Sequence, residues 1–282
     1  MVPIARHPRR QRARLTPLPI PVRQTPAGVA ISPDGTRLAV ALAGTPAALR
    51  IYSLPAGKLL RSWTAASGQI TATPPQPGTW PFTELALRWS ADGRRLAFAW
   101  NAAAIRVLDA TAPGGSLLAT SSELAAIGTL YTPGRGSVTC AATQGWSLIA
   151  GGNGIVCAVR MRTTSAQSAP VAGLSGVPSG GGACSGAQRF VYGFIRETVS
   201  ASGSGHTPQL LASAADCGGQ SVPASGAYIG WASADGSTLI GSLVRDGNSR
   251  FGVFRDDRFT LLPPLPVSMP VGAGVLIGTD AW

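Results

Sequence analysis

The feature that most constrains this chain is a Ser-x-Asp-Gly turn between two apolar segments, which occurs three times. Residues 29–42 read VAISPDGTRLAVAL, residues 85–100 read LALRWSADGRRLAFAW, and residues 227–243 read AYIGWASADGSTLIGSL. Asp-Gly between apolar runs predicts a β-hairpin, because the glycine tolerates positive φ and the aspartate hydrogen-bonds the turn backbone. The pattern gives a structural role in these turns to Asp34, Gly35, Asp92, Gly93, Asp235 and Gly236.

Two degenerate copies of the same unit fill the interval between the second and third hairpins. Residues 138–151 read VTCAATQGWSLIAG and put Gly145 at a turn. Residues 183–194 read ACSGAQRFVYGF and put Gly186 at a turn. The turn glycines then recur at intervals of about 40 to 60 residues, a spacing typical of propeller blades with four short strands each.

The segments after the hairpins supply the third and fourth strands of each unit. Residues 49–60 read LRIYSLPAGKLL and residues 105–118 read IRVLDATAPGGSLL, so Leu59-Leu60 and Leu117-Leu118 match as fourth strands. Residues 249–262 repeat this layout. No stretch shows a sustained apolar pattern at helical spacing, so the sequence predicts an all-β chain.

Closure of the ring would use both ends of the sequence. Residues 272–282, GAGVLIGTDAW, match the opening strand of a sixth blade, and residues 15–25 would supply its missing strands. Such closure removes exposed strand edges that otherwise invite aggregation. We therefore predict a β-propeller of six four-stranded blades, with five or seven blades as the alternatives.

One pair of segments carries a family resemblance. LRWSADGRRLAFAW followed by IRVLDA resembles the Asp-Gly-type propeller repeats of TolB-like and WD-repeat-like bacterial proteins. The resemblance is strongest at 29–60 and 85–118, and as architecture it covers nearly all of the chain after residue 24. The combined Gly-His and Trp-Asp signature of eukaryotic WD repeats is absent, because no Trp-Asp occurs and the one Gly-His pair, at 205–206, stands alone. The resemblance implies a propeller, a fold that serves scaffolds, periplasmic accessory proteins and enzymes alike.

The net charge of +11 is concentrated at the N-terminus. The first 24 residues contain no Asp or Glu, and their basic residues are Arg6, Arg9, Arg10, Arg12, Arg14 and Arg23. We predict a disordered Arg/Pro-rich tail at 1–24 and a single propeller domain at 25–282. An arginine-rich arm can bind phosphate groups electrostatically, so nucleic acid or an anionic surface is an alternative partner for Arg6 to Arg14.

The compartment is predicted from the absence of a leader. Three prolines interrupt residues 15–22, LTPLPIPV, where a signal peptide would need an apolar helix. No apolar run is long enough to cross a bilayer. We expect a cytoplasmic protein, with an extracytoplasmic location as the alternative if a leader or anchor precedes Met1.

The four cysteines contain no Cys-x-x-Cys pair, so a zinc or redox motif is not indicated. The repeat pattern puts Cys140 and Cys157 on non-adjacent strands of one blade, roughly 9.5 Å apart and beyond disulfide reach. An intervening strand also separates Cys184 from Cys217. We therefore expect buried free thiols.

The sequence offers no catalytic constellation. A phosphate loop, a dinucleotide fingerprint and a Gly-x-Ser-x-Gly elbow are all absent, and no spacing suggests metal ligands. We expect no enzymatic activity, cofactor or metal. The alternative is a carbohydrate-active or other hydrolytic propeller with a site in its central channel, for which the candidate acids are Glu84, Glu123 and Glu197.

Two aromatic residues are the candidates for partner binding. Trp80 and Phe82 lie in TPPQPGTWPF at 73–82, a proline-rich insertion that no blade needs. Aromatic side chains on loops commonly anchor protein partners. We therefore expect a monomeric, non-enzymatic scaffold that binds an unidentified protein through its loop faces.

Overall fold

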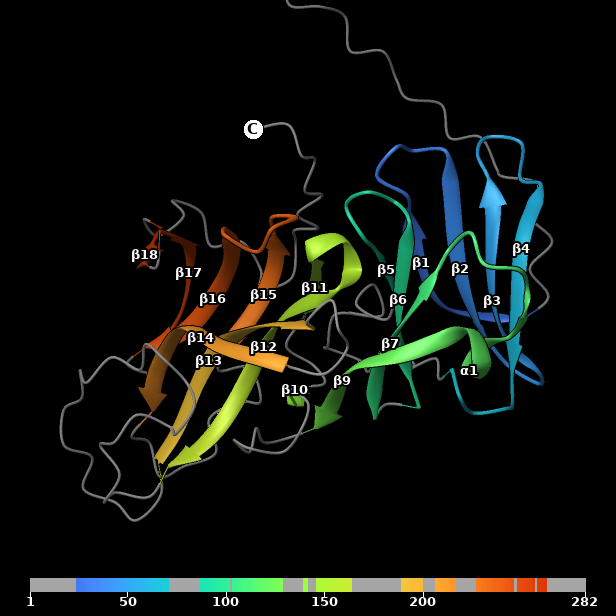
Figure 1. Ribbon diagram of the computed structural model, residues 1–282. Helices are drawn as coiled ribbons and strands as arrows, with labels where there is room; N and C mark the ends of the chain where they lie inside the picture. The colour runs from blue at the N-terminus through green and yellow to red at the C-terminus, as the bar shows by residue number, and fades with distance from the viewer. Residues whose placement is uncertain are drawn as a thin grey trace, which may run out of the picture.

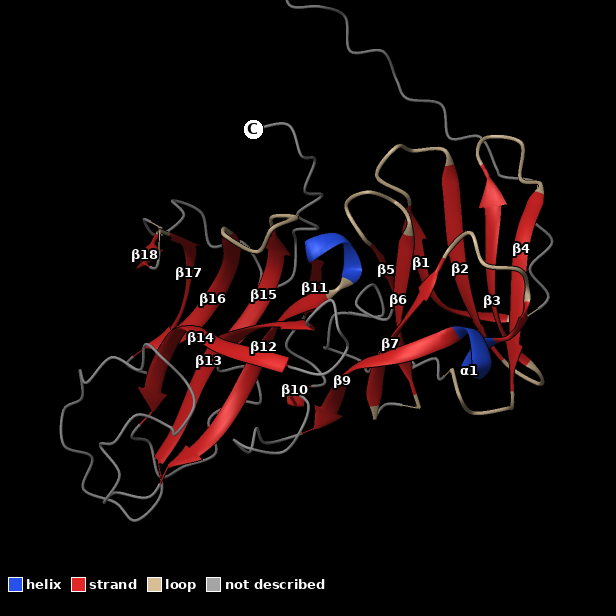
Figure 2. Cartoon of the chain, viewed as in Figure 1, coloured by secondary structure: helices blue, strands red, loops and turns tan. Residues whose placement is uncertain are grey.

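The computed structural model describes ten stretches of the chain: residues 24–70, 87–101, 103–128, 139–141, 146–163, 189–199, 206–216, 227–245, 248–256 and 258–262. These residues are mostly β-strand joined by turns, with one four-residue helix and one short 3-10 turn (Figure 2). The prediction of an all-β chain is confirmed for this part of the protein. None of its helices has the length and apolar character needed to span a membrane.

The first sheet contains four antiparallel strands in chain order: β1 (Thr25–Ile31), β2 (Arg37–Ala43), β3 (Ala47–Ser53) and β4 (Leu59–Ala65). The hairpin at 29–42 and the two strands within 49–60 are therefore confirmed. A fifth, two-residue strand, β8 (Gly115–Ser116), pairs in parallel with β4 from a distant part of the sequence.

The second sheet is formed by β5 (Leu87–Trp89), β6 (Arg95–Trp100), β7 (Ala104–Asp109), β9 (Ser121–Gly128) and β10 (Thr139–Ala141). Strand β10 pairs in parallel with β9 at the edge of this sheet. The prediction that Leu117 and Leu118 belong to its fourth strand is wrong. They begin the one-turn helix α1 (Leu117–Thr120), whose N-cap Ser116 accepts a bond from the Ala119 amide, and Leu117 is buried in the core.

The third and fourth sheets have four strands each. The third contains β11 (Trp146–Ile149), β12 (Gly154–Thr163), β13 (Arg189–Val199) and β14 (His206–Asp216). The fourth contains β15 (Ala227–Ala232), β16 (Leu239–Arg245), β17 (Asn248–Arg255) and β18 (Arg258–Leu261). Adjacent strands are antiparallel in both sheets.

The two degenerate copies do not form separate units. The predicted hairpin at 138–151 is wrong, because β10 belongs to the second sheet and β11 to the third. Gly145 lies outside the described residues, between these two strands. Gly186 also lies outside them, in the connection between β12 and β13 of a single sheet. The described residues thus form four sheets where the sequence suggested five units, and residues 272–282 fall outside the description.

The four sheets follow one another in space, from blue to red in Figure 1. The first strand of each sheet contacts the first strand of the next, in the order β1, β5, β11 and β15. Apolar clusters fill the boundaries: Trp63 and Phe98 share the first, Ile105 and Trp146 the second, and Ile149 and Phe254 the third. Small antiparallel sheets stacked face to face with their first strands in succession are consistent with propeller blades.

A disulfide crosses the second of these boundaries. Cys140 on β10 and Cys157 on β12 are bonded, with their Cα atoms 5.6 Å apart, and both are buried. The expectation of free thiols at these positions is wrong. The sequence argument placed both residues two strands apart in one sheet, whereas they lie on contacting strands of two neighbouring sheets. Cys184 and Cys217 lie outside the described residues.

Candidate functional site

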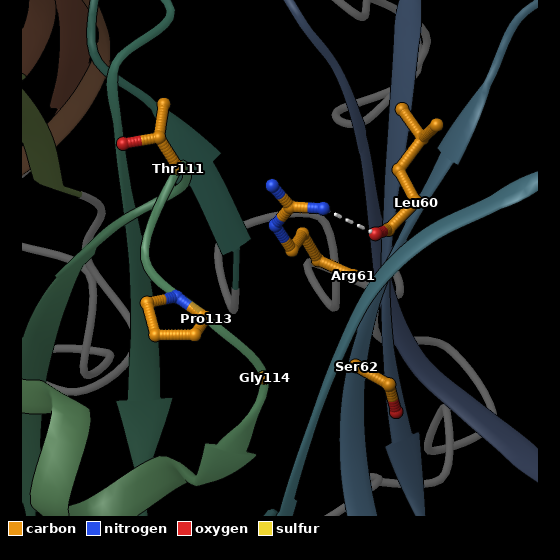
Figure 3. Close-up of a pocket in the computed structure, with 6 residues that line it drawn as sticks. All are labelled: Leu60, Arg61, Ser62, Thr111, Pro113 and Gly114. Carbon is orange, nitrogen blue, oxygen red and sulfur yellow. Dashed lines mark hydrogen bonds between the residues drawn. The ribbon is translucent and has the colours of Figure 1, made fainter.

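A pocket of about 560 Å³ opens at the outer edge of the first sheet. On one side it is bounded by β4, and on the other by the crossover segment, residues 110–116, which connects β7 to α1 (Figure 3). We call it the edge pocket. Its lining residues are Leu60, Arg61, Ser62, Thr111, Pro113 and Gly114.

The crossover segment is held against the first sheet by backbone and side-chain contacts. The indole Nε1 of the fully buried Trp63 donates to the Pro113 carbonyl at 3.0 Å. Two residues after Pro113, Gly115 pairs with Trp63 in the parallel ladder. A Cβ on Gly114 would lie 2.4 Å from the Ser62 carbonyl oxygen, so only glycine permits this approach. The far wall of the edge pocket is therefore fixed.

The threonine at the mouth of the edge pocket is oriented by an aspartate. Both the amide and the hydroxyl of Thr111 donate to Oδ1 of Asp109, at 2.7 and 2.6 Å. These two bonds, the hydroxyl first, lower the pKa of Asp109 below its usual value. The carboxylate is thus ionised at neutral pH and keeps the Thr111 hydroxyl turned toward it.

The cation of the edge pocket is Arg61. Its Nη1 donates to the carbonyl of Leu60 at 2.8 Å, and its side chain extends between β4 and the crossover segment (Figure 3). Leu59 and Leu60 are both exposed beside it, as is Leu118 on α1, which contacts β4. An exposed guanidinium next to leucine side chains can bind a carboxylate that lies beside an apolar group.

The aspartates of the Ser-x-Asp-Gly turns have their oxygens engaged locally. In the first turn the Ser32 hydroxyl donates to Oδ1 of Asp34 at 2.5 Å, and the Thr36 amide donates to the same oxygen at 3.0 Å. In the other two turns, the hydroxyls of Ser90 and Ser233 donate to Oδ1 of Asp92 and Asp235, each at 2.6 Å. The glycines that follow, Gly35, Gly93 and Gly236, have φ of +70°, +66° and +72°.

The turn hydrogen bonds shift the acidity of these three carboxyl groups. The pKa of Asp34 and the pKa of Asp235 are each lowered to about 2. The largest cause is the hydrogen bond from the serine hydroxyl, and the next is the bond from a backbone amide. The pKa of Asp92 is lowered by the same two kinds of bond. The geometry gives these acids a role in stabilising hairpins.

Of the three acids considered for a hydrolytic site, the two that the structure describes lie on separate sheets. Glu123 is exposed on β9 of the second sheet, and Glu197 is buried on β13 of the third. Glu84 lies outside the described residues. Within the described stretches, no group of three or more His, Cys, Asp or Glu residues could hold a metal ion.

The partner-binding residues proposed from sequence are not in the described part of the chain. Trp80, Phe82 and the N-terminal arginines all lie outside it. Sequence reasoning missed the edge pocket, because residues 110–116 were interpreted as a simple turn. The available signal was the longer linker in DATAPGGSLL at 109–118 compared with SLPAGKLL at 53–60.

Comparison with known proteins gives only distant matches. No family model matches the chain, and no curated protein matches its sequence. The acylaminoacyl peptidase of Pyrococcus horikoshii is 11% identical with a TM-score of 0.37, over 80% of this chain and 30% of that one. A functionally unknown protein from Desulfotomaculum acetoxidans is 11% identical with a TM-score of 0.40, over 85% and 55%.

A complex of the fission yeast SREBP–SCAP binding domains is 9% identical with a TM-score of 0.37, over 88% of this chain and 51% of the matched one. The chain thus spans between 30% and 55% of the length of these solved chains. The description of the fold rests on the strand pairing and sheet packing given above.

Proposed function

We propose that this chain is a non-enzymatic β-propeller that binds a protein partner, and that the edge pocket is one contact site. The observation that carries the proposal is Arg61, an exposed cation flanked by the exposed Leu59 and Leu60 at a preformed pocket. Arginine and large apolar side chains together are typical of the residues that dominate protein–protein binding energy. The partner segment would carry a carboxylate next to an apolar side chain.

Two further properties support this kind of partner. The walls of the edge pocket are fixed before binding by the Trp63–Pro113 hydrogen bond and the Gly114 contact, which reduces the entropy lost on association. The formal charge of +11 attracts acidic partners at long range. The loop that carries Trp80 and Phe82 is proposed as a second contact. The complete fold is proposed to be a closed ring of five blades, one of the alternatives from the sequence, because the described residues up to 262 form four sheets.

The experiment compares two short peptides, Ac-Glu-Leu-Asp-Leu-NH₂ and its amide analogue Ac-Gln-Leu-Asn-Leu-NH₂, by NMR titration of the full chain. The acidic peptide should shift the amide signals of Leu60, Ser62 and Thr111. Arg61→Gln should weaken its binding about tenfold, the value of one hydrogen bond to a charged group. Arg255→Gln, at an exposed arginine on β17, is the matched control and should leave binding unchanged.

Three results would contradict the proposed site. They are shifts confined to other sheets, equal binding of the amide analogue, or equal loss of binding in the two arginine variants. The last would show that only overall charge matters, since both substitutions remove one positive charge.

The compartment enters the proposal through the disulfide. Disulfides persist in oxidising environments and are rare in the cytosol. The Cys140–Cys157 bond therefore favours the extracytoplasmic alternative over the cytoplasmic expectation.

A further inference from the structure

The outer edge of β4 is only partly covered by the crossover segment. Strand β8 pairs with β4 at Trp63 and Thr64 alone. Nearer the start of β4, the edge pocket separates the two (Figure 3). Within the described residues, no strand pairs with this side of residues 59–62. We call Leu59, Leu60, Arg61 and Ser62 the open edge.

A proline explains why the β8 ladder does not continue along the open edge. Counting back from Gly115, the crossover segment has Gly114 and then Pro113. Proline has no backbone N–H and cannot donate to a neighbouring strand. The Pro113 carbonyl is already the acceptor of the Trp63 indole N–H, at 3.0 Å. The crossover segment therefore ends its pairing with β4 at this point.

The backbone carbonyls of the open edge point toward the edge pocket. A Cβ on Gly114 would lie 2.4 Å from the Ser62 carbonyl oxygen, so this oxygen is directed at the crossover segment. The Leu60 carbonyl accepts from Arg61 Nη1, and the Arg61 side chain extends between β4 and the crossover segment (Figure 3). Leu60 is also the extra residue of a β-bulge and has no register partner on β3. Two carbonyls on alternate residues thus face the space beside β4.

Arg61 caps one of these carbonyls in the free protein. Sheet edges bind other chains unless charged side chains or covering segments block them. The 2.8 Å bond from Arg61 Nη1 to the Leu60 carbonyl is such a block, and it lies at an exposed position. A peptide N–H can take the place of the guanidinium at this carbonyl. The guanidinium is then available to bind a carboxylate, for which it makes stronger hydrogen bonds.

The residues around the open edge select an acidic and apolar peptide. Lys58 and Arg61 are both exposed. Asp109, which precedes the crossover segment, already accepts two hydrogen bonds from Thr111. Leu59 is 48% exposed and offers an apolar contact. Because successive side chains of a strand point to opposite faces, a peptide in which acidic and apolar residues alternate presents one kind to each face.

We propose that an extended acidic segment of a protein partner binds the open edge as an added β-strand. Its backbone N–H groups donate to the Leu60 and Ser62 carbonyls, and Arg61, released from Leu60, pairs with a carboxylate of the segment. Main-chain hydrogen bonds of this kind give affinity in strand addition, and the alternate side chains give specificity. The inference rests on the proposed function, because it takes the edge pocket as the contact site and adds the mode of binding.

The experiment tests the peptide backbone with two N-methylated forms of Ac-Glu-Leu-Asp-Leu-NH₂, titrated against the full chain by NMR. One form carries N-methyl groups on both leucines, and the other carries them on the glutamate and the aspartate. An added strand directs the N–H groups of alternate residues to the sheet and the remaining ones away from it. One form should therefore bind about thirtyfold more weakly than the unmethylated peptide, for two lost hydrogen bonds, while the other stays within about twofold.

The two methylated peptides are matched controls for each other, because they have the same side chains and the same number of methyl groups. Equal affinities of the two forms, whether high or low, would overturn strand addition. Binding of the unmethylated peptide would still stand in that case, so this failure differs from a failure of the edge pocket itself.

A measurement without chemical modification uses nuclear Overhauser contacts between the unmethylated peptide and the chain. Contacts between backbone protons of the peptide and those of residues 59–62 are expected, and contacts with side chains alone would contradict the proposal. Signals of the open edge that shift with the concentration of the chain alone, together with a doubled mass in sedimentation, would identify the occupant as a second copy and would also overturn it.

Discussion

Replacing Arg37 by Gln tests whether an arginine contact holds the first two sheets together. The guanidinium donates one hydrogen bond to Gly93, in the second sheet, and lies over the ring of Trp89. A hydrogen bond from a charged group contributes about 1.5 kcal/mol, and a partly exposed cation–π contact about 0.5 kcal/mol. The free energy of unfolding should therefore fall by about 2 kcal/mol, roughly a thirtyfold change in the ratio of folded to unfolded protein.

The assay is urea unfolding followed by tryptophan fluorescence, because Trp89 lies directly at the contact. Arg255→Gln, an exposed position, is the control and should change the free energy of unfolding by less than about 0.5 kcal/mol. Arg37→Lys keeps the charge but loses the planar guanidinium, so its free energy of unfolding should lie between those of the Arg37→Gln and Arg255→Gln variants. Equal stability of the Arg37→Gln and Arg255→Gln variants would refute the reasoning, since charge alone would then account for both.

Two further predictions concern the disulfide and the turn carboxylates. Cys140→Ser should lower the free energy of unfolding by about 3 kcal/mol, because the bond to Cys157 closes a loop with a sequence separation of 17. Thiol trapping in intact cells, followed by non-reducing peptide mapping, shows whether the bond forms in the cell. Free thiols at both positions would contradict the disulfide. The carboxyl groups of Asp34 and Asp235 should titrate near pH 2 by NMR, below the ordinary 3.8. Because folding lowers both pKa values, the two ionised carboxylates stabilise the folded state above about pH 4, and this contribution is lost as pH falls toward 2. Titration midpoints near pH 4 for Asp34 and Asp235 would contradict the turn hydrogen bonds.

The hairpins at 29–42, 85–100 and 227–243 could be predicted because their information is local. The Ser32 hydroxyl donates to Asp34, and the two side chains accept from the backbone amides of Arg37 and Thr36, so the turn specifies its own geometry. The corresponding turn of the third sheet, Ala150–Gly152, has neither residue type, and the sequence pattern placed its hairpin several residues too early.

The remaining errors arise from contacts between sheets, which no local pattern encodes. The assignment of residues 115–116 to the first sheet depends on the bond from Trp63 to Pro113, fifty residues away in the sequence. The disulfide was missed for a similar reason, because Cys140 and Cys157 were compared as strands of one sheet. The edge pocket exists only where the crossover segment meets β4, so it too is a product of packing between sheets.

The crossover segment also determines which part of the chain can fold alone. If the polypeptide were cut between β4 and β5, the first sheet would keep its four strands and lose the residues that pair with β4. The indole N–H of Trp63 would then lose its acceptor inside the core, and an unpaired backbone edge would be open to other chains. A fragment that keeps the first sheet intact must therefore include the crossover segment, and one that keeps the first two sheets should end after Ala141, the last residue of β10, rather than after Ala65.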